Sequence, residues 1–141
     1  MNTKDALKQL SDLFDNYDFI FRNKFLEELH ALLFSELKGK ESKFFKCLTN
    51  QLKYVHDFGV LVHKTDGHEQ IKGFDGHYYS IHIERKEFNI RFLVHISDTG
   101  TSHFLCAFYE RAGKRHTDYT SYTDVMEQRF REFQKGDADN E

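Results

Sequence analysis

Two histidines and an arginine on neighbouring predicted strands are the residues of this chain best suited to chemistry. Residues Tyr78–Glu84 and Asn89–Ile96 alternate between apolar and polar side chains, which is typical of half-buried strands. Isoleucine, valine and phenylalanine occupy one face of this pattern. His82, Arg91 and His95 are therefore predicted to share the sheet face that points away from the apolar core.

Such a set of side chains suits the cleavage of an RNA phosphodiester. Histidine titrates near neutral pH, at about 6.5 when unperturbed. One imidazole would accept the proton of the 2′-hydroxyl, and the other would donate a proton to the leaving 5′-oxygen. Arg91 would neutralise the charge that develops on the phosphate. The alternative is that His82 and His95 lie on an open polar sheet face and take part in no reaction.

A basic turn follows the third predicted strand, His103–Tyr109, and gives a credible contact for phosphates. Tyr109 would stack on a base or simply cover the sheet edge. Arg85 and Lys86, in the turn between the first two strands, pose the same choice between RNA binding and a solvated surface. The residues of the basic turn after the third strand are Arg111, Lys114, Arg115 and His116.

No metal or cofactor site is expected. The chain has nine histidines, but no HExxH or CxxC pattern and no glycine-rich phosphate loop. Cys47 falls in a helical pattern and Cys106 in a strand pattern, so both are interpreted as reduced, buried thiols rather than a disulfide framework.

The helical segments place the chain in the α+β class. Apolar spacing predicts helices over Thr3–Phe14, Asn23–Leu37 and Glu41–Phe58, and a short closing helix from about Tyr122 to Phe130. The second and third form a helical hairpin with one apolar face. A three-stranded sheet with one apolar face follows, and the simplest arrangement packs one on the other.

The connecting segments are less distinct. Tyr17–Phe21 reads either as a short strand or as the entry to the next helix, and Val60–His63 as a further strand. One domain over residues 1–134 is expected, because 141 residues can bury a sizeable core. The acidic tail, residues 135–141, is expected to be disordered.

Charge and hydropathy indicate which partners and which cellular location to expect for the protein. The net charge is −3, yet residues 82–116 hold six basic and four acidic side chains, whereas residues 117–141 hold three and seven. A local basic surface can attract phosphates even in a mildly acidic protein. There is no apolar signal region at the start and no apolar run of about 18 residues, so a soluble, cytoplasmic protein is expected, without a membrane segment.

The order of these patterns resembles the RelE/ParE superfamily of bacterial toxins, nearest its HigB-like, phage-related branch. The resemblance runs from about Phe19 to Phe133 and rests on pattern and order. The segments that carry it are Ile71–Phe74 leading into Tyr78–Ile83, then Ile90–Leu93, Phe104–Arg111 and finally Asp124–Phe130.

The chain departs from the family pattern in several places. His82 stands where the family has an arginine. Glu110 and Arg111 replace a pair of lysines, with Lys114 and Arg115 a little later, and the proline that usually follows is absent. Residues 1–16 are an additional N-terminal helix, and the chain is more acidic than family toxins generally are.

The resemblance implies a RelE-like antiparallel sheet packed against an N-terminal helical hairpin, with a short C-terminal helix. It also implies the toxin of a type II toxin–antitoxin system. Such a toxin is a metal-independent endoribonuclease that cleaves messenger RNA on the ribosome and is inhibited by a cognate antitoxin protein. Arg91 and Arg111 carry over as phosphate-binding residues. Two alternatives stay open: a non-catalytic binding protein of the same fold, and a ParE-type inhibitor of DNA gyrase.

Overall fold

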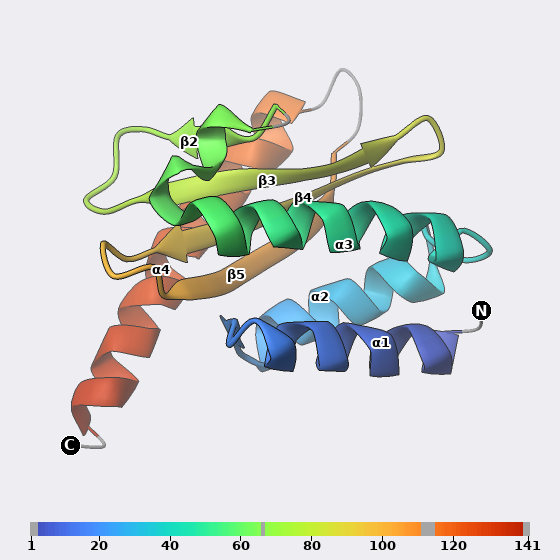
Figure 1. Ribbon diagram of the computed structural model, residues 1–141. Coiled ribbons are helices and arrows are strands. Elements are labelled where there is room, and N and C mark those ends of the chain that lie inside the picture. Colours follow the sequence, from blue (N-terminus) through green and yellow to red (C-terminus); the bar gives the residue numbers. More distant parts are fainter. Residues whose placement is uncertain (1–2, 66, 111–114, 140–141) are drawn as a thin grey trace.

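A long antiparallel meander of three strands forms the centre of the fold (Figure 1). The structure, a computed structural model, describes residues 3–65, 67–110 and 115–139. The elements in chain order are α1 (Thr3–Asn16), β1 (Ile20–Phe21), α2 (Asn23–Phe34), α3 (Glu41–Phe58), the 3-10 helix η1 (Gly59–Lys64), β2 (Glu69–Ile71), β3 (Tyr78–Arg85), β4 (Phe88–Ile96), β5 (Ser102–Tyr109) and α4 (Arg115–Asp139).

The five strands form one sheet in the order β1-β5-β4-β3-β2. Strands β2 to β5 pair antiparallel, and only the two-residue β1 runs parallel to its neighbour, β5. The α+β class is thus confirmed, with a mixed sheet rather than a purely antiparallel one.

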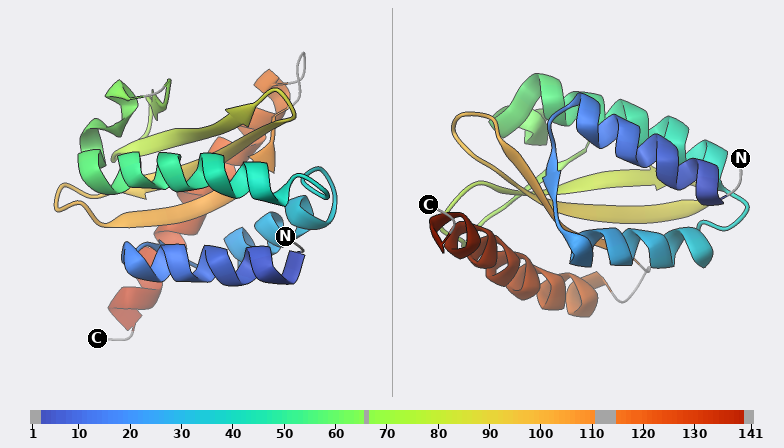
Figure 2. Two further views of the ribbon diagram at one scale, coloured as in Figure 1. Left: turned by 45° about the vertical axis from the view of Figure 1, so that its right-hand side comes forward. Right: turned by 90° about the horizontal axis from the view of Figure 1, so that it is seen from below.

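Helices cover both faces of this sheet. The three N-terminal helices share one large core with its inner face, and α3 lies in front of the sheet in Figure 1 while α4 crosses behind it. Figure 2 shows α4 on the side opposite to α3. The second core, beneath α4, consists of Tyr78, Leu93, Leu105, Cys106, Phe108, Met126 and Phe133.

Aromatic rings fill the first core. Phe14 of α1 and Phe25 of α2 both lie against Phe104 of β5, with ring centroids 4.8 and 5.8 Å apart. Phe25 also meets Phe92 of β4 edge to face at 5.1 Å, a preferred aromatic geometry. This cluster joins α1, the predicted N-terminal addition, to the same core as the rest of the chain.

A β-bulge in β5 sets which side chains face each core. Leu93 pairs with Cys106 and Val94 with Phe104, so that Leu105 is an extra residue in β5. After the bulge, Cys106 and Phe108 face α4, whereas Ala107 and Tyr109 face the other core.

The edge of β5 beyond the bulge is closed by side chains, because β1 reaches only His103 and Phe104. The Ala107 N–H donates to Glu28 Oε1 of α2 at 3.1 Å. Arg129 Nη1 of α4 donates to the Leu105 carbonyl oxygen at 2.7 Å and to Glu28 Oε1 at 2.7 Å. We call this group the Glu28–Arg129 clamp, since it ties a helix of each layer to the same strand.

Several predicted elements are correct. The helix over Glu41–Phe58 is α3, with the same bounds, and Gly59 ends it with a φ of 51°, which glycine adopts at little cost. The strands β3, β4 and β5 lie within one residue of their predicted bounds at each end. Of the two alternatives for Tyr17–Phe21, the short strand is present as β1.

Other expectations are wrong. Residues Val60–His63 lie in the 3-10 helix η1 and not in a strand, and the strand β2 was not expected. The α2 helix ends at Phe34 rather than Leu37, because the backbone turns so that the Leu37 N–H donates to the Leu32 carbonyl oxygen.

The C-terminal helix is much longer than predicted. It begins at Arg115, within the predicted basic turn, and continues through Asp139 instead of ending near Phe130 in a disordered tail. Phe133, which lies beyond the end of the predicted helix, is buried against the His103 ring with centroids 5.0 Å apart. Residues 140–141 lie outside the described part of the chain.

Both cysteines are buried thiols, as expected. Burial raises the pKa of the Cys106 thiol to about 12, so that it stays protonated at neutral pH. None of the described helices is both long and apolar enough to cross a membrane.

The clamp makes a stability prediction. Glu28→Ala leaves the Arg129 guanidinium without its carboxylate and the Ala107 N–H without its acceptor, so we expect the free energy of unfolding to fall by about 2–3 kcal/mol. The measurement is urea denaturation followed by circular dichroism. Glu27→Ala, at the exposed neighbouring position, is the control and should change stability by less than about 0.5 kcal/mol. Equal effects of the two substitutions would argue against the clamp.

Candidate functional site

His82 and Arg91 are brought together by the register of the sheet. They are direct partners on β3 and β4, and both lie on the face opposite the large core, as the alternation predicts. Side chains directly opposite on antiparallel strands have Cβ atoms about 4.5–5.5 Å apart. This pair is the centre of the candidate site.

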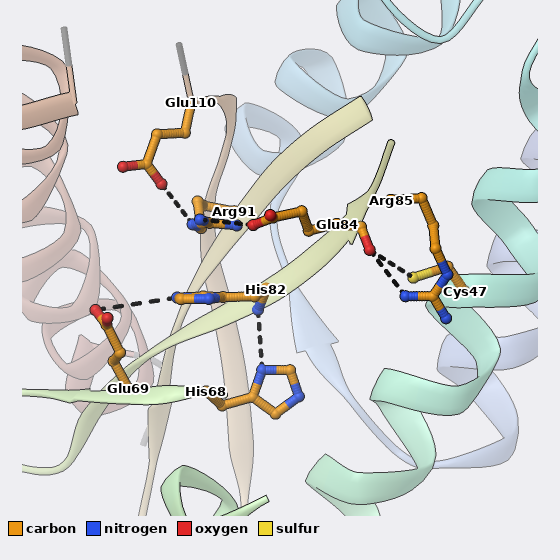
Figure 3. A network of polar contacts seen from close by, with 8 residues as sticks. All are labelled: Cys47, His68, Glu69, His82, Glu84, Arg85, Arg91 and Glu110. Atoms are coloured by element: carbon orange, nitrogen blue, oxygen red, sulfur yellow. Dashed lines mark hydrogen bonds and ion pairs between the residues drawn. The ribbon is translucent and has the colours of Figure 1, made fainter. Parts of the chain in front are cut away.

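Carboxylates and a further imidazole surround the pair (Figure 3). They come from the end of β3, the end of β5 and the start of β2, so that, with Arg91 on β4, four strands contribute to one polar group. We call it the His82–Arg91 cluster; its members are His68, Glu69, His82, Glu84, Arg91 and Glu110.

Arg91 is buried and carries two carboxylate partners. Only 7% of the residue is exposed. Its Nη2 lies 3.1 Å from Glu84 Oε1, and its Nε lies 2.5 Å from Glu110 Oε2. Glu110 is itself buried, whereas the Glu84 side chain is 55% exposed. A phosphate that binds Arg91 must therefore share the guanidinium with Glu110 and can displace Glu84 more easily.

Two buried nitrogens of Arg91, Nε and Nη1, make no hydrogen bond among the described residues. Nε still has its ion-pair partner Glu110, whereas Nη1 is left without an acceptor in this part of the chain. A buried donor without an acceptor costs about 1–3 kcal/mol, so the position favours an anionic or oxygen-rich ligand. Arginine is well suited to this because its donors fit phosphate oxygens in pairs.

His82 is neutral at physiological pH. Burial, then the charges of Arg91 and His68, lower its pKa to about 3. Its Nε2 lies 4.0 Å from Glu69 Oε2, too far for a hydrogen bond, and its backbone N–H donates to His68 Nδ1 at 3.0 Å. A neutral imidazole can accept a proton, and a phosphate bound to Arg91 would raise its pKa.

His95 does not belong to this site, which corrects the expected pair of imidazoles. It pairs with Tyr78, four residues further along β4 than Arg91, which is about 13 Å at the rise of a strand. Its ring stacks on Phe130 of α4, with centroids 3.7 Å apart. Burial, then the charges of His103 and His77, lower its pKa to about 4. Strand alternation fixes the face of a side chain but not its distance from another on that face.

Tyr109 is also separated from Arg91. It pairs with Ile90 and packs against the large core, so it lies on the opposite face of the sheet. Phe108 is the β5 partner of Arg91, and it stacks on Tyr122 with ring centroids 4.2 Å apart. An aromatic pair therefore borders the cluster, but it is not the tyrosine that was expected to stack on a base.

The expected RNA-binding residues fall into two groups. Arg85 and Lys86 are exposed at the β3–β4 hairpin, where Arg85 Nη1 donates to the Glu84 carbonyl oxygen at 2.8 Å. The others lie beyond β5. Arg111 and Lys114 are outside the described residues, and Arg115 and His116 begin α4 with side chains outside them.

The sequence reasoning missed the four other members of the cluster. Glu84 carried a usable signal, since it follows His82 by two residues and so shares its face. Glu110 follows the last residue of β5 and reaches Arg91 only because of the bulge. Glu69 begins β2 and His68 directly precedes it; this strand is too short to show alternation.

In the part of the chain that the structure describes, no group of three or more histidine, cysteine, aspartate or glutamate side chains is arranged to hold a metal ion.

Comparison of the chain with protein-family models, curated proteins and solved structures finds no match.

His95 gives a pH prediction. Its pKa is lowered on folding from 6.5 to about 4, so the unfolded chain binds the proton more readily. The stabilisation of the fold by the neutral His95 imidazole is complete above pH 6.5 and is lost as the pH falls toward 4. At pH 5 the free energy of unfolding should be lower by about 2 kcal/mol. His95→Phe should remove that part of the pH dependence, as measured by urea unfolding at pH 7 and pH 5. His56→Phe, at an exposed position, should not; an unchanged slope in His95→Phe would contradict the assignment.

Proposed function

We propose that this protein is an endoribonuclease toxin of the RelE/ParE kind, which cleaves messenger RNA at the His82–Arg91 cluster without a metal ion. Two observations support the proposal. The order of α2, α3, the β3–β5 meander and α4 agrees with the order that the family resemblance implies, while α1, β1, η1 and β2 are additional and α4 is longer. The open Nη1 of buried Arg91 beside a neutral imidazole carries the chemical argument.

The proposed reaction uses the two central residues in different ways. Arg91 binds the phosphate and stabilises the charge of the five-coordinate transition state. His82 Nε2 accepts the proton of the 2′-hydroxyl, whose oxygen forms the new bond to phosphorus. The 5′-oxygen leaves and takes a proton from water, so the products are a 2′,3′-cyclic phosphate and a 5′-hydroxyl. Since His95 lies too far away, it has no part in this scheme.

Glu84 and Glu110 adjust the affinity of Arg91 for phosphate. Without RNA they compensate the buried charge of the guanidinium, which would otherwise be costly. The exposed carboxylate of Glu84 is the one that an incoming phosphate displaces. A cognate antitoxin protein and ribosome-bound messenger RNA are the partners proposed with this function, and its setting is the cytoplasm.

One observation favours a second candidate, a non-catalytic binding protein of the same fold. Both carboxylates on Arg91 are ion-paired at short distance, which is the arrangement of a purely structural arginine. The two candidates differ in what Arg91 is for, and this can be tested.

The first test is the substitution Arg91→Lys. Lysine keeps a positive charge between Glu84 and Glu110 but loses the open Nη1 donor, so we expect the fold to persist and RNA cleavage to fall by at least about 100-fold. Wild type, Arg91→Lys and the control Arg131→Lys, at an exposed site on α4, are induced in a bacterial host. Growth and messenger RNA integrity are followed together.

Arrested growth with cut messages in wild type and Arg131→Lys, but not in Arg91→Lys, is the expected result. Cleavage that persists in folded Arg91→Lys would overturn the role of Arg91. Normal growth with intact messages for every variant would favour the binding protein, and a halt of DNA replication with intact messages would favour a gyrase inhibitor.

A second substitution tests the competition at Arg91. Glu84→Gln removes one negative charge beside the guanidinium, so affinity for a non-cleavable RNA should rise by about fivefold, equivalent to roughly 1 kcal/mol. Fluorescence anisotropy with a 2′-O-methyl oligonucleotide measures it. Asp98→Asn, an exposed carboxylate at the far end of the sheet, is the matched control. An equal gain in both variants would mean that only the net charge matters.

A further inference from the structure

A row of lysines follows one side of α3 and leads to the β3–β4 hairpin. Lys43, Lys46, Asn50 and Lys53 are exposed and recur at intervals of three and four residues, which places them on one face of the helix. At 1.5 Å per residue the row is about 15 Å long. Asp57 ends it.

The hairpin continues this row. Lys40 Nζ donates to the Glu87 carbonyl oxygen at 3.0 Å, and Lys43 Nζ lies 2.9 Å from Glu87 Oε1. These contacts hold the start of α3 against the hairpin, where Arg85 and Lys86 are exposed. We call the combined surface the α3–hairpin surface; its cations are Lys40, Lys43, Lys46, Lys53, Arg85 and Lys86.

The positive charge of this surface is largely uncompensated. Glu87 is the only carboxylate that the described residues place in an ion pair with these six cations. Lys46 and Lys53 have no ion-pair partner among the described residues. The surface therefore carries a local excess of positive charge in a protein whose net charge is −3.

The polar character of the surface points to a nucleic acid rather than a protein. Protein interfaces have an apolar core, whereas interfaces with nucleic acids are polar and positive. The large apolar side chains exposed in the described residues are Ile20, Phe34, Phe58 and Leu61, and none falls between Lys40 and Lys53. The exposed neighbours of the lysines are instead Ser42, Thr49 and Asn50. Ser42 and Asn50 can donate hydrogen bonds to phosphates, whereas the Thr49 hydroxyl donates to the Phe45 carbonyl oxygen at 2.7 Å.

The surface reaches the His82–Arg91 cluster through a single residue. The Glu84 carbonyl oxygen accepts from Arg85 Nη1 on the α3 side of the hairpin. Its carboxylate accepts from Arg91 Nη2 on the other side, as Figure 3 shows. A nucleic-acid chain that runs along α3 and over the β3–β4 hairpin would therefore come close to Arg91.

We propose that the α3–hairpin surface binds the sugar–phosphate backbone of single-stranded RNA and guides it to the His82–Arg91 cluster. The direction toward the cluster rests on the proposed ribonuclease function; the binding does not. Because only phosphates are contacted, binding by this surface is independent of base sequence and strongly dependent on salt.

The test is the binding of a fluorescent 2′-O-methyl oligouridine of 20 nucleotides, which cannot be cleaved, between 50 and 300 mM salt. Lys46→Glu/Lys53→Glu should weaken binding at least tenfold at 100 mM salt. It should also flatten the slope of log K against log salt by about 1.4, or 0.7 for each lost phosphate contact. The control is Lys24→Glu/Lys135→Glu, which changes the net charge equally at exposed positions on α2 and α4, and it should bind within about twofold of wild type.

Three results would overturn the proposal: no binding by wild type, an equal loss in both double variants, or displacement of the RNA by polyglutamate of equal charge concentration. The last would assign the surface to an acidic protein. Failure of the ribonuclease function is seen separately. If wild type and Arg91→Lys bind the modified RNA equally and neither cuts unmodified RNA, the surface stands and the catalytic proposal falls.

Discussion

The Glu28–Arg129 clamp is the interaction on which the arrangement of this fold depends. An edge strand with free N–H and C=O groups normally needs a neighbour, or it pairs with other chains. Here β1 supplies a neighbour for only two residues of β5. Beyond them, one carboxylate and one guanidinium from opposite layers take the free groups of Ala107 and Leu105. The bulge, the edge and the docking of α4 are thereby fixed together.

The same constraint places the residues of the candidate site. The bulge directs Phe108 toward α4 and beneath Tyr122, and the Glu110 N–H donates to the Asn89 carbonyl oxygen at 2.9 Å just beyond the strand. That bond holds Glu110 next to Arg91. Without the extra residue in β5, the side chains after it would face the other way, and Arg91 would lose its buried partner. The electrostatics around Arg91 are therefore set in part by a backbone irregularity at Leu105, on the neighbouring strand.

Much of this fold follows from local sequence. The faces of β3 and β4 and both bounds of α3 were predictable, because alternation and helical spacing act over a few residues and Gly59 marks an end. The separation of His82 from His95 was not predictable in this way, since both obey the alternation and only the register gives their distance. Glu110 was hidden by the bulge, and β2 by its length of three residues. The length of α4 was missed because its docking depends on Phe133 and its partners across the sheet.

Net charge is a poor guide to what such a protein can bind, and the distribution of its charges explains why. A charge acts over about 8–10 Å at physiological ionic strength, less than the length of the α3–hairpin surface. A phosphate near Lys46 therefore responds mainly to the neighbouring lysines of α3, and hardly to acidic residues on distant parts of the molecule. Arg91 shows the opposite case, since its charge is largely cancelled within 4 Å by Glu84 and Glu110. A surface with uncompensated positive charge is suited to attracting phosphates. A buried arginine whose charge is compensated is suited to binding only a group that can displace one of its carboxylate partners. A backbone phosphate delivered along α3 has the charge to do so.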